Sequence, residues 1–515
     1  MNTPAWLMIL CTILLILNQK SAAQNQSMMR YEISVKDTMD HLLHVSLVGS
    51  GINKDSVLLK LPKWTPGYYQ LMDYDQSISN IKATVNGRIT LWNKLPDNKL
   101  LLNNVKPSSF KVEYDVKANR QFVANSLVDS NHAYIIPGSV FFYVSDVANI
   151  LYSVKVIPRQ GWNLVATGLE PVKNKDHEYI AQNIDVLYDS PILMGKLDTL
   201  PSFYIQGIKH NFIGYDIGNF DKPGFISKLS RVVHAASDII GDIPYKEYSF
   251  IAIGPGRGGI EHLNNTTFSF TGNDLDKPRN TNRMLNFLAH EYFHHYNVKR
   301  IRPYELGPFN YDGPNRTNLL WVSEGLSVYY EYMIVRRAGL SSDSTLLQNF
   351  ERNITAHENN PGKNYQSLIQ ASYETWSEGP FGKSNADSNK TISYYDKGPI
   401  VGMILDFAIR NATHNQKSLD DVMRALYWKY YKHLKRGFTD AEFQSACESF
   451  AGRSMKDEFR YVYTAELMDY NKYLNLGGLK LKIDKDANGK EIYSLMKMDQ
   501  IDESQMNIWK SWTGN

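Results

Sequence analysis

The hydrophobic period of the chain changes near residue 195, and this change limits the folds that the chain can adopt. From Met29 to about Gly195, short segments alternate apolar and polar residues between turns rich in Gly, Asn, Asp and Pro. Alternation of this kind is typical of half-buried strands in an antiparallel sandwich. The predicted strands are Tyr31–Val35, Leu42–Val48, Ser56–Leu61, Leu100–Val105, Phe110–Val116 and Tyr152–Pro158.

Beyond Gly195, apolar residues recur every three to four positions, which predicts amphipathic helices. These helices are Phe225–Ile240, Arg283–Val298, Trp321–Leu340, Tyr394–Arg410 and Leu419–Lys432. Two polar segments, 303–318 and 358–389, are expected to be loops. We therefore predict a multidomain α+β protein, with a β-sandwich domain over 24–197 and a mainly helical domain over 198–476.

The last residues, 477–515, are predicted to form a β-hairpin and a short tail. Asp484-Lys-Asp-Ala-Asn-Gly489 begins like a calcium-binding EF loop, but its twelfth position is Leu495 instead of a bidentate glutamate. The flanking segments Leu479–Ile483 and Glu491–Met496 are instead typical of two strands joined by a turn.

His290-Glu291-Tyr292-Phe293-His294 is the strongest chemical signal in the chain, and it lies in a predicted helix. Histidines four positions apart share one helical face, so His290 and His294 can reach one metal ion. Glu291 can then take a proton from a metal-bound water. The pattern fixes only three positions, so a buried helix with incidental histidines stays an alternative.

Glu324 is the candidate third ligand, because a catalytic zinc usually takes three protein ligands and leaves a fourth position for water. It is flanked by apolar residues, where an unpaired carboxylate would be costly to bury. Its alternative role is an acidic residue that suits the first turn of a helix. Glu331, two turns further on, is expected either to hydrogen-bond a ligand histidine or to be a solvated surface residue.

Two further segments offer groups that could contact a substrate. Gly254-Pro-Gly-Arg-Gly-Gly-Ile-Glu-His262 lies between two predicted strands, Tyr248–Ile253 and Asn264–Phe270, so it lacks the helix that a dinucleotide-binding loop needs. Its Gly258 and Gly259 allow a backbone to approach a ligand, and Glu261 then offers a carboxylate. The alternative is a plain hairpin loop. Tyr395 can donate a hydrogen bond to an oxyanion, although packing is the default role for a tyrosine.

These residues resemble the glycyl aminopeptidase family of gluzincin metallopeptidases over about residues 30 to 480. Shorter matches occur at Trp64-Thr-Pro-Gly67, Asp189-Ser-Pro191, Arg337-Ala-Gly-Leu340 and Tyr394-Tyr-Asp-Lys-Gly398. The longer ones are His-Glu-Tyr-Phe-His-His-Tyr-Asn-Val-Lys-Arg-Ile-Arg-Pro (290–303), Leu-Leu-Trp-Val-Ser-Glu-Gly-Leu-Ser-Val-Tyr-Tyr (319–330) and Gly-Gly-Ile-Glu-His (258–262).

The resemblance implies an N-terminal β domain followed by a thermolysin-like zinc peptidase domain that cleaves peptides after small N-terminal residues such as glycine or alanine. His290, His294 and Glu324 would bind one zinc ion, and Glu291 would be the general base. Glu261 would hold the free α-amine of the peptide. Tyr395 would stabilise the tetrahedral intermediate.

The chain departs from the family in two respects. His295 and Tyr296 stand where the family often has Thr and Trp, and His295 lies about a hundred degrees round the helix from His294, so it is expected not to bind the metal. Family members usually carry a PDZ domain, but only about thirty-five residues follow Gly478, too few for one.

The start of the chain predicts export. An apolar run from Leu7 to Leu17 precedes Ser21-Ala-Ala-Gln24, which is typical of a signal peptide cleaved near Ala23, so residues 1–23 are expected to be removed. The run is too short for a membrane span. The protein is therefore expected to be periplasmic or secreted, with Cys447 as its single remaining cysteine. The formal charge of +3 gives no support for nucleic-acid binding, and the oligomeric state cannot be predicted.

Three functions fit these residues. The first is an exported zinc aminopeptidase acting on peptides. The second is a zinc endopeptidase or other hydrolase, because without Glu261 as an amine anchor nothing in the sequence requires a free N-terminus. The third is a non-catalytic binding protein whose metal is structural, which would need a fourth protein ligand.

Overall fold

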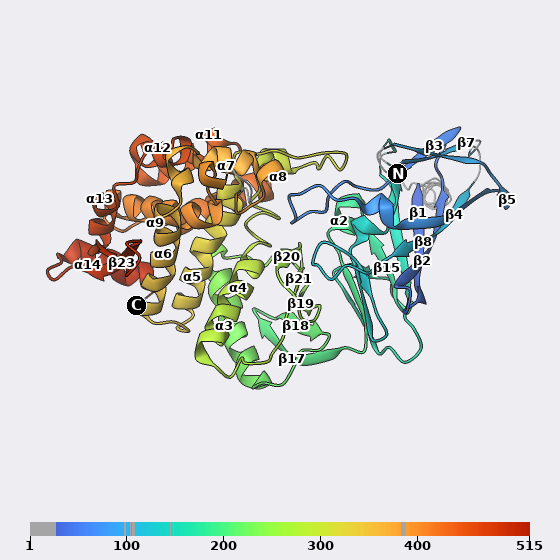
Figure 1. Ribbon diagram of the computed structural model, residues 1–515, viewed down its shortest axis with the longest axis horizontal. Coiled ribbons are helices and arrows are strands. Elements are labelled where there is room, and N and C mark those ends of the chain that lie inside the picture. Colours follow the sequence, from blue (N-terminus) through green and yellow to red (C-terminus); the bar gives the residue numbers. More distant parts are fainter. Residues whose placement is uncertain are drawn as a thin grey trace, which may run out of the picture. The chain divides into compact units, whose positions relative to one another are not determined.

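The computed structural model describes residues 27–96, 99–103, 105, 109–144, 146–147, 149–382 and 388–514 (Figure 1). The predicted signal peptide, residues 1–23, lies outside this part of the chain. The chain divides into two compact units. The first comprises Met1–Pro66 and Met72–Leu197, and the second comprises Gly67–Leu71 and Asp198–Asn515.

The first unit is built from three sheets. The eight-stranded sheet has the order β14 (Glu170–Pro171), β15 (Glu178–Ala181), β12 (Leu151–Ile157), β1 (Met28–Asp37), β2 (Leu42–Ser50), β8 (Phe110–Lys117), β4 (Ile78–Val85) and β5 (Arg88–Ile89). The second sheet has the order β13 (Leu164–Thr167), β16 (Ile192–Gly195), β10 (His132–Ile135) and β9 (Leu127–Val128). The third has the order β11 (Tyr143–Val144), β3 (Ser56–Lys60), β7 (Lys99–Asn103) and β6 (Trp92–Leu95). A short helix, α2 (Ile184–Tyr188), precedes β16.

All six strands predicted for this unit are confirmed, as β1, β2, β3, β7, β8 and β12. Their side chains alternate as expected, because one face of each strand is buried and the other is not. One pairing differs from the predicted antiparallel arrangement. β1 and β12 are parallel, with Met28 opposite Leu151. The long stretch of chain between them allows the crossover that a parallel pair requires.

The second unit begins with a five-stranded sheet in the order β17 (Asp198–Ile205), β18 (Ile208–Gly214), β19 (Glu247–Ala252), β21 (Asn265–Phe268) and β20 (Gly259–Glu261). The predicted strands at Tyr248–Ile253 and Asn264–Phe270 are confirmed as β19 and β21. β17 and β18 were not predicted. A register shift between Leu200 and Phe203 interrupts the alternation of buried and exposed side chains in β17. The sequence of this strand therefore lacks the two-residue period by which strands are predicted. β20 forms one edge of this sheet.

Helices make up most of the remaining second unit. Their bounds are α3 (Lys222–Ile240), α4 (Pro278–Phe293), the π-helical turn η4 (Trp321–Gly325), α5 (Leu326–Arg337), α6 (Asp343–Glu358), α7 (Leu368–Tyr373), α8 (Thr375–Glu378), α9 (Tyr394–Ala412), α10 (Leu419–Leu426), the π-helix η7 (Tyr427–Leu434), α11 (Asp440–Ala451), α12 (Lys456–Tyr463) and α13 (Tyr470–Leu474). α4 lies between α3 and α5 (Figure 1).

The five predicted helices are present, with shifted ends. α4 begins at Pro278, because proline suits the first position of a helix, and it ends five residues before Val298. The predicted loop over 358–389 contains α7 and α8. In the described part of the chain, no helix combines the length and the apolarity that a membrane crossing requires.

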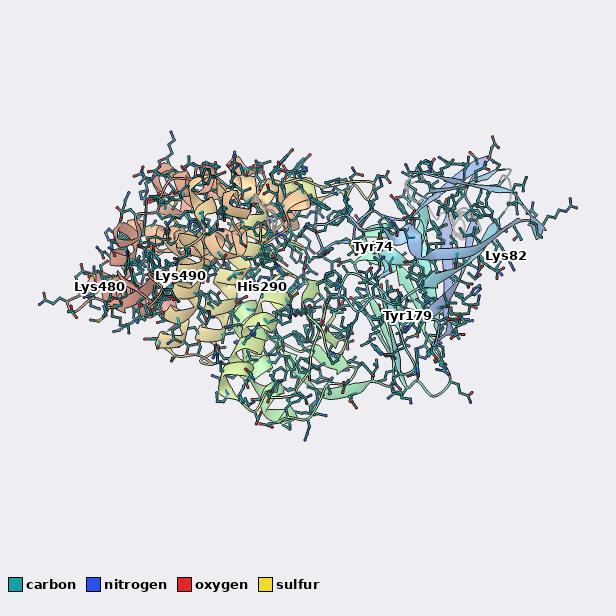
Figure 2. All side chains as sticks on the ribbon, viewed as in Figure 1. Tyr74, Lys82, Tyr179, His290, Lys480 and Lys490 are labelled. Atoms are coloured by element: carbon teal, nitrogen blue, oxygen red, sulfur yellow. The ribbon has the colours of Figure 1, made fainter. Side chains whose placement is uncertain are left out.

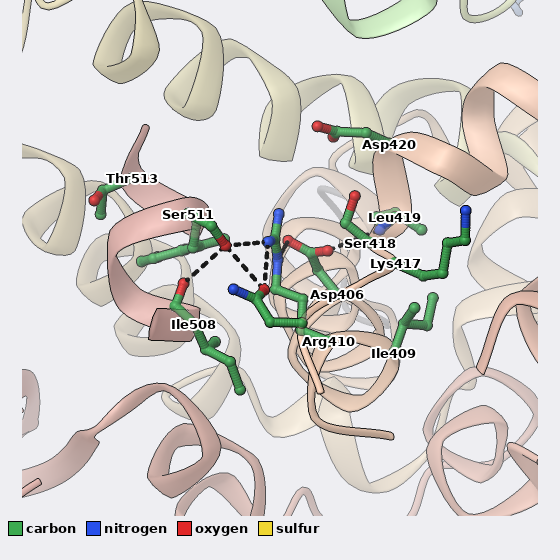
Figure 3. A network of polar contacts seen from close by, with 12 residues as sticks. Asp406, Ile409, Arg410, Lys417, Ser418, Leu419, Asp420, Ile508, Ser511 and Thr513 are labelled. Atoms are coloured by element: carbon green, nitrogen blue, oxygen red, sulfur yellow. Dashed lines mark hydrogen bonds and ion pairs between the residues drawn. The ribbon is translucent and has the colours of Figure 1, made fainter. Parts of the chain in front are cut away.

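The predicted C-terminal hairpin is confirmed as β22 (Leu479–Lys485) and β23 (Glu491–Lys497), and a further helix, α14 (Glu503–Thr513), follows it. A polar network joins α14 to α9 (Figure 3). Arg410 donates to Ser511 Oγ at 2.6 Å and to Asp406 Oδ2 at 3.1 Å. Trp512 Nε1 donates to the Tyr329 hydroxyl at 2.9 Å. The last helix is therefore part of the core of the second unit.

Candidate active site

The end of α4 and the turn η4 bring the three predicted metal ligands together. His290 lies in the last turn of α4 (Figure 2), and His294 is the residue that caps the helix. Their Nε2 atoms are 2.9 Å apart. Oε2 of Glu324 lies 3.6 Å from Nε2 of His290 and 3.2 Å from Nε2 of His294. All three side chains are buried, so one cation can contact all of them.

A close contact between two glycines holds Glu324 in this position. Gly325 in η4 and Gly398 in α9 face each other, and a Cβ on Gly325 would lie 2.7 Å from the α-carbon of Gly398. Only glycines allow two helices to approach so closely. The contact places α9 against η4, and Tyr395 of α9 donates its hydroxyl proton to Glu324 Oε2 at 2.8 Å.

The outer nitrogen of each histidine faces an acceptor, which orients the inner nitrogen toward Glu324. Nδ1 of His294 lies 2.8 Å from the carbonyl oxygen of Asn297. Nδ1 of His290 lies 3.1 Å from Oε2 of Glu331, an ion-pair distance, although the pair does not have hydrogen-bond geometry. Outer partners of this kind fix the tautomer in which Nε2 offers its lone pair to a metal. Two imidazoles and one carboxylate, oriented in this way, fit a catalytic zinc.

Asn297 also supports the site, although it was not among the predicted site residues. Its side-chain amide donates to the carbonyl oxygen of Val322 at 2.8 Å and lies 3.1 Å from Ser327 Oγ. Its backbone carbonyl holds His294. One residue therefore joins the end of α4 to the turn that carries Glu324. Its position three residues after the second histidine is the only signal in the sequence.

The ligand histidines and the neighbouring carboxylates shift one another's pKa values. Burial by itself would lower the pKa of His290, but contacts with the carboxylates of Glu324 and Glu331 raise it well above its usual value. Burial would raise the pKa of Glu324, but the two imidazoles hold it below its usual range. For Glu331, burial prevails over the nearby imidazole and raises the pKa. The carboxylate of Glu324 is therefore charged where a cation would bind.

Glu291 lies beside strand β20, where the absence of a side chain on Gly259 makes room for it. A Cβ on Gly259 would lie 2.6 Å from Oε1 of Glu291. Thr266 Oγ1 donates to Oε2 of Glu291 at 3.4 Å. Burial raises the pKa of Glu291 to about 7, against the effect of the two histidines. A carboxyl group with a pKa near neutrality can both take and return a proton.

Glu261 is buried at the end of β20, and its Oε1 has no hydrogen-bond partner among the described residues. Gly67, in the segment Gly67–Leu71, lies against it. A Cβ on Gly67 would be 3.0 Å from Oε2 of Glu261 and 2.4 Å from Cγ2 of Ile260. The φ angle of Gly67 is +89°, which also favours glycine.

The segment Gly67–Leu71 packs on the helical part of the second unit. The ring of Tyr69 meets the ring of Trp376 edge to face at 6.1 Å, and Gln70 donates to the carbonyl oxygen of Thr375 at 3.2 Å. In the sequence, this segment is marked by the motif Trp64-Thr-Pro-Gly67, for which no role was predicted. Gly67 is therefore a second supporting residue outside the predicted site.

Tyr395 keeps its proton and faces the ligand set. Burial and the charge of Glu324 raise the pKa of Tyr395 well above its usual value. The largely exposed ring of Phe381 stacks on Tyr395 with centroids 5.3 Å apart. His295 and His262, the other histidines near the motif, are not in the ligand cluster. His295 packs among aromatic rings, including that of Tyr292 at 4.6 Å.

Two family models match the chain. The peptidase M61 N-terminal domain matches residues 30–196, and the M61 glycyl aminopeptidase matches residues 283–401. Together they span more than half of the chain. The chain belongs to the M61 peptidase family. The resemblance inferred from the sequence is thereby confirmed, and this family member is a zinc aminopeptidase, a hydrolase of peptide bonds. Glu261 lies between the two matched stretches.

Solved structures share the fold of this M61 protein. An aminopeptidase N family protein from Idiomarina loihiensis is 23% identical, with a TM-score of 0.84 over 90% of this chain and 81% of that one. A mutant M1 zinc metallopeptidase from Deinococcus radiodurans, bound to a Tyr-Ser-Ala substrate, is 12% identical, with a TM-score of 0.56 over 87% and 95%. Yeast LTA4 hydrolase in complex with bestatin is 13% identical, with a TM-score of 0.53 over 88% and 69%. A comparison with curated proteins finds no match.

Proposed function

We propose that this M61 protein removes the first residue of peptides that have a free amino terminus, and that it favours glycine or alanine at that position. The observation that carries the proposal is the buried Oε1 of Glu261, which has no hydrogen-bond partner among the described residues. Glu261 is on the same strand as Gly259, beside which Glu291 lies. A buried carboxylate without a partner is costly, and a substrate ammonium group would compensate it.

The reaction follows from the positions of five side chains. Zinc held by His290, His294 and Glu324 would acidify water and polarise the peptide carbonyl. Glu291 takes a proton from the attacking water and delivers it to the leaving amine. Tyr395 donates a hydrogen bond to the oxygen that becomes negatively charged, a role its retained proton permits.

Modification of the peptide N-terminus tests this proposal. We expect N-acetylation of alanyl peptides to abolish cleavage, because the acetylated nitrogen has no positive charge and cannot form an ion pair with Glu261. We expect Glu261→Gln to lower kcat/KM for the free-amine peptide roughly ten- to a hundredfold, since a hydrogen bond to a charged group is worth about 1.5–3 kcal/mol. Equal rates for acetylated and free peptides would instead support the endopeptidase alternative. Rates on glycyl, alanyl and leucyl amides measure the preference for small residues.

Gly67→Ala tests whether the segment Gly67–Leu71 positions Glu261. The new Cβ is expected to displace Glu261 or Ile260 and to lower kcat/KM for free-amine peptides about tenfold, mainly through KM. Gly207→Ala is the matched control, because Gly207 has a similar φ of +80° and no atom within 4 Å of the added Cβ. Both variants should lose about 1–3 kcal/mol of stability from backbone strain. Equal kinetics of the two variants would show that Gly67 has no role at the site.

We also propose that the protein is exported. The support is the apolar run Leu7–Leu17 followed by Ser21-Ala-Ala-Gln24. The N-terminal sequence of the protein isolated from its source decides the matter, because a mature chain beginning near Gln24 requires cleavage by a signal peptidase.

The remaining alternative, a binding protein with a structural metal, has less support. A structural zinc site is closed by four protein ligands. Among the described residues, the cluster that could hold a metal consists of His290, His294 and Glu324. Three ligands leave a position for water, as catalysis requires.

A further inference from the structure

A hollow in the second unit lies along α4. Its volume is about 1540 Å³, and it is lined by residues of α3, α4, α5 and α6 and of the loop before α6. Ligand pockets usually measure about 300–1,000 Å³, so this hollow has room for several peptide residues.

Two lining residues are neighbours of active-site residues. Glu331 faces Nδ1 of His290 at 3.1 Å. Phe287, one turn before His290 on α4, has a ring carbon 2.9 Å from the position that a Cβ on Gly259 would occupy. Through Phe287, the hollow comes within about one helical turn of Glu291 on α4.

The direction of β20 and α4 indicates which part of a substrate would enter the hollow. A peptide held by its amine at Glu261, as proposed above, has its first peptide bond near Glu291 and Gly259. The residues that follow continue past Gly259, on the side of Phe287. From there α4 runs back through Arg283 and Arg279, which both line the hollow. The leaving part of the peptide thus lies along α4.

The hollow carries cations that are available to a ligand. Lys228, Arg279, Arg283 and Arg352 line it, and among the described residues no ion pair is found for any of them. Arg352 donates to Oδ1 of Asn349 and interacts electrostatically with Glu331, so Arg279 and Arg283 are the less committed cations. The acidic lining residues are Asp221, Asp276 and Glu331. Two of these already have partners, because Asp221 accepts from the backbone N–H of Gly224 and Glu331 faces His290. The free positive charge suits a carboxylate, which arginine binds through two parallel hydrogen bonds.

The spacing along α4 sets the length of peptide that reaches these arginines. Arg283 is seven residues before His290, which corresponds to about 10 Å at a rise of 1.5 Å per residue. An extended peptide covers about 3.4 Å per residue, so Arg283 lies about three residues beyond the cleaved bond. We propose that Arg283, with Arg279 and Arg352, binds the C-terminal carboxylate of peptides of about four to six residues.

This proposal rests on the aminopeptidase function. The same peptide tests both proposals, because its N-terminus reports on the amine site and its C-terminus reports on the carboxylate site. Tetra-alanine with a free C-terminal carboxylate is compared with tetra-alanine amide, both with free amines, by kcat/KM of the zinc-loaded protein. We expect the acid to be cleaved about tenfold faster than the amide and expect dialanine to show no such preference. A tetrapeptide amide that ends in aspartate distinguishes a side-chain carboxylate from the chain terminus.

Arg283→Gln should remove the preference by slowing cleavage of the acid alone. Arg88→Gln, an exposed residue of β5, changes the net charge equally and should leave the preference intact. Equal rates for acid and amide in the wild-type protein, or equal loss on both in Arg283→Gln, would overturn the proposal. Should Arg283→Gln unfold, 0.5 M salt must reduce the wild-type preference, because exposed charges are screened.

Failure of the carboxylate-site proposal can be distinguished from failure of the aminopeptidase proposal. If acetylated and free peptides are cleaved alike, the aminopeptidase proposal fails whatever the C-terminus does. If no peptide is cleaved, calorimetry with the zinc-loaded Glu291→Gln variant still compares binding of tetra-alanine and its amide. Tighter binding of the acid supports the carboxylate site, and equal binding rejects it.

Discussion

Glu291→Gln is expected to lower kcat/KM for alanyl peptides by at least about a thousandfold. Glutamine has the same shape as glutamate but cannot take a proton, and general acid–base catalysis contributes about 10²–10⁴. Glu291 is expected to act both on the attacking water and on the leaving amine, so the loss should be at the upper end. The amide fits the same space beside Gly259, where the carboxylate lies now.

The same variant should keep its zinc, because the ligand atoms belong to His290, His294 and Glu324. Metal analysis after dialysis should give one zinc per chain for both proteins. Glu503→Gln, at an exposed position of α14, is the control for the lost charge and should retain full activity. Activity of Glu291→Gln within tenfold of the wild type would exclude Glu291 as the base.

Glu324→Ala is expected to lose both zinc and activity. Its carboxylate lies within 3.6 Å of the Nε2 atoms of both histidines, so its removal leaves two ligands of three. Zinc affinity should fall by more than about a hundredfold. Glu331→Gln provides a graded comparison, because loss of an outer partner typically costs about 10- to 100-fold in affinity.

Thermal unfolding gives a readout that does not depend on turnover. A bound metal at a thousand times its Kd stabilises the folded state by about 4 kcal/mol, so a chelator should lower the Tm of the wild-type protein. The chelator should leave the Tm of Glu324→Ala unchanged, because that variant has no zinc to lose. One zinc per chain in dialysed Glu324→Ala would contradict the ligand assignment.

The ligands could be predicted from the sequence because their relation is local. His290 and His294 are four residues apart on one helix, so helical geometry alone places them on one face. Glu324 was predicted from its apolar neighbours, and the structure places its carboxylate beside both imidazoles. Six strands of the first unit were predicted because their alternation is regular, whereas others, such as β4, were not predicted. β17 was missed because a register shift interrupts its alternation.

Other features depend on contacts between distant parts of the chain. Gly67 meets Glu261, nearly two hundred residues later, and no local pattern relates them. Asn297 supports the ligand turn through backbone carbonyls, which any sequence supplies equally. The charged hollow combines residues of four helices, and each helix alone has an ordinary polar face.

The sequence by itself determined the chemistry, because metal ligands and a base at helical spacing are a property of short segments. The tertiary structure decided what the chemistry acts on. It packs Gly67 against the buried Glu261, and it gathers the arginines of α4 and Arg352 of α6 around one hollow. Both arrangements join residues that are far apart in the sequence. Close backbone contacts and the burial of charge select which of these residues meet, and local periodicity does not report either of them.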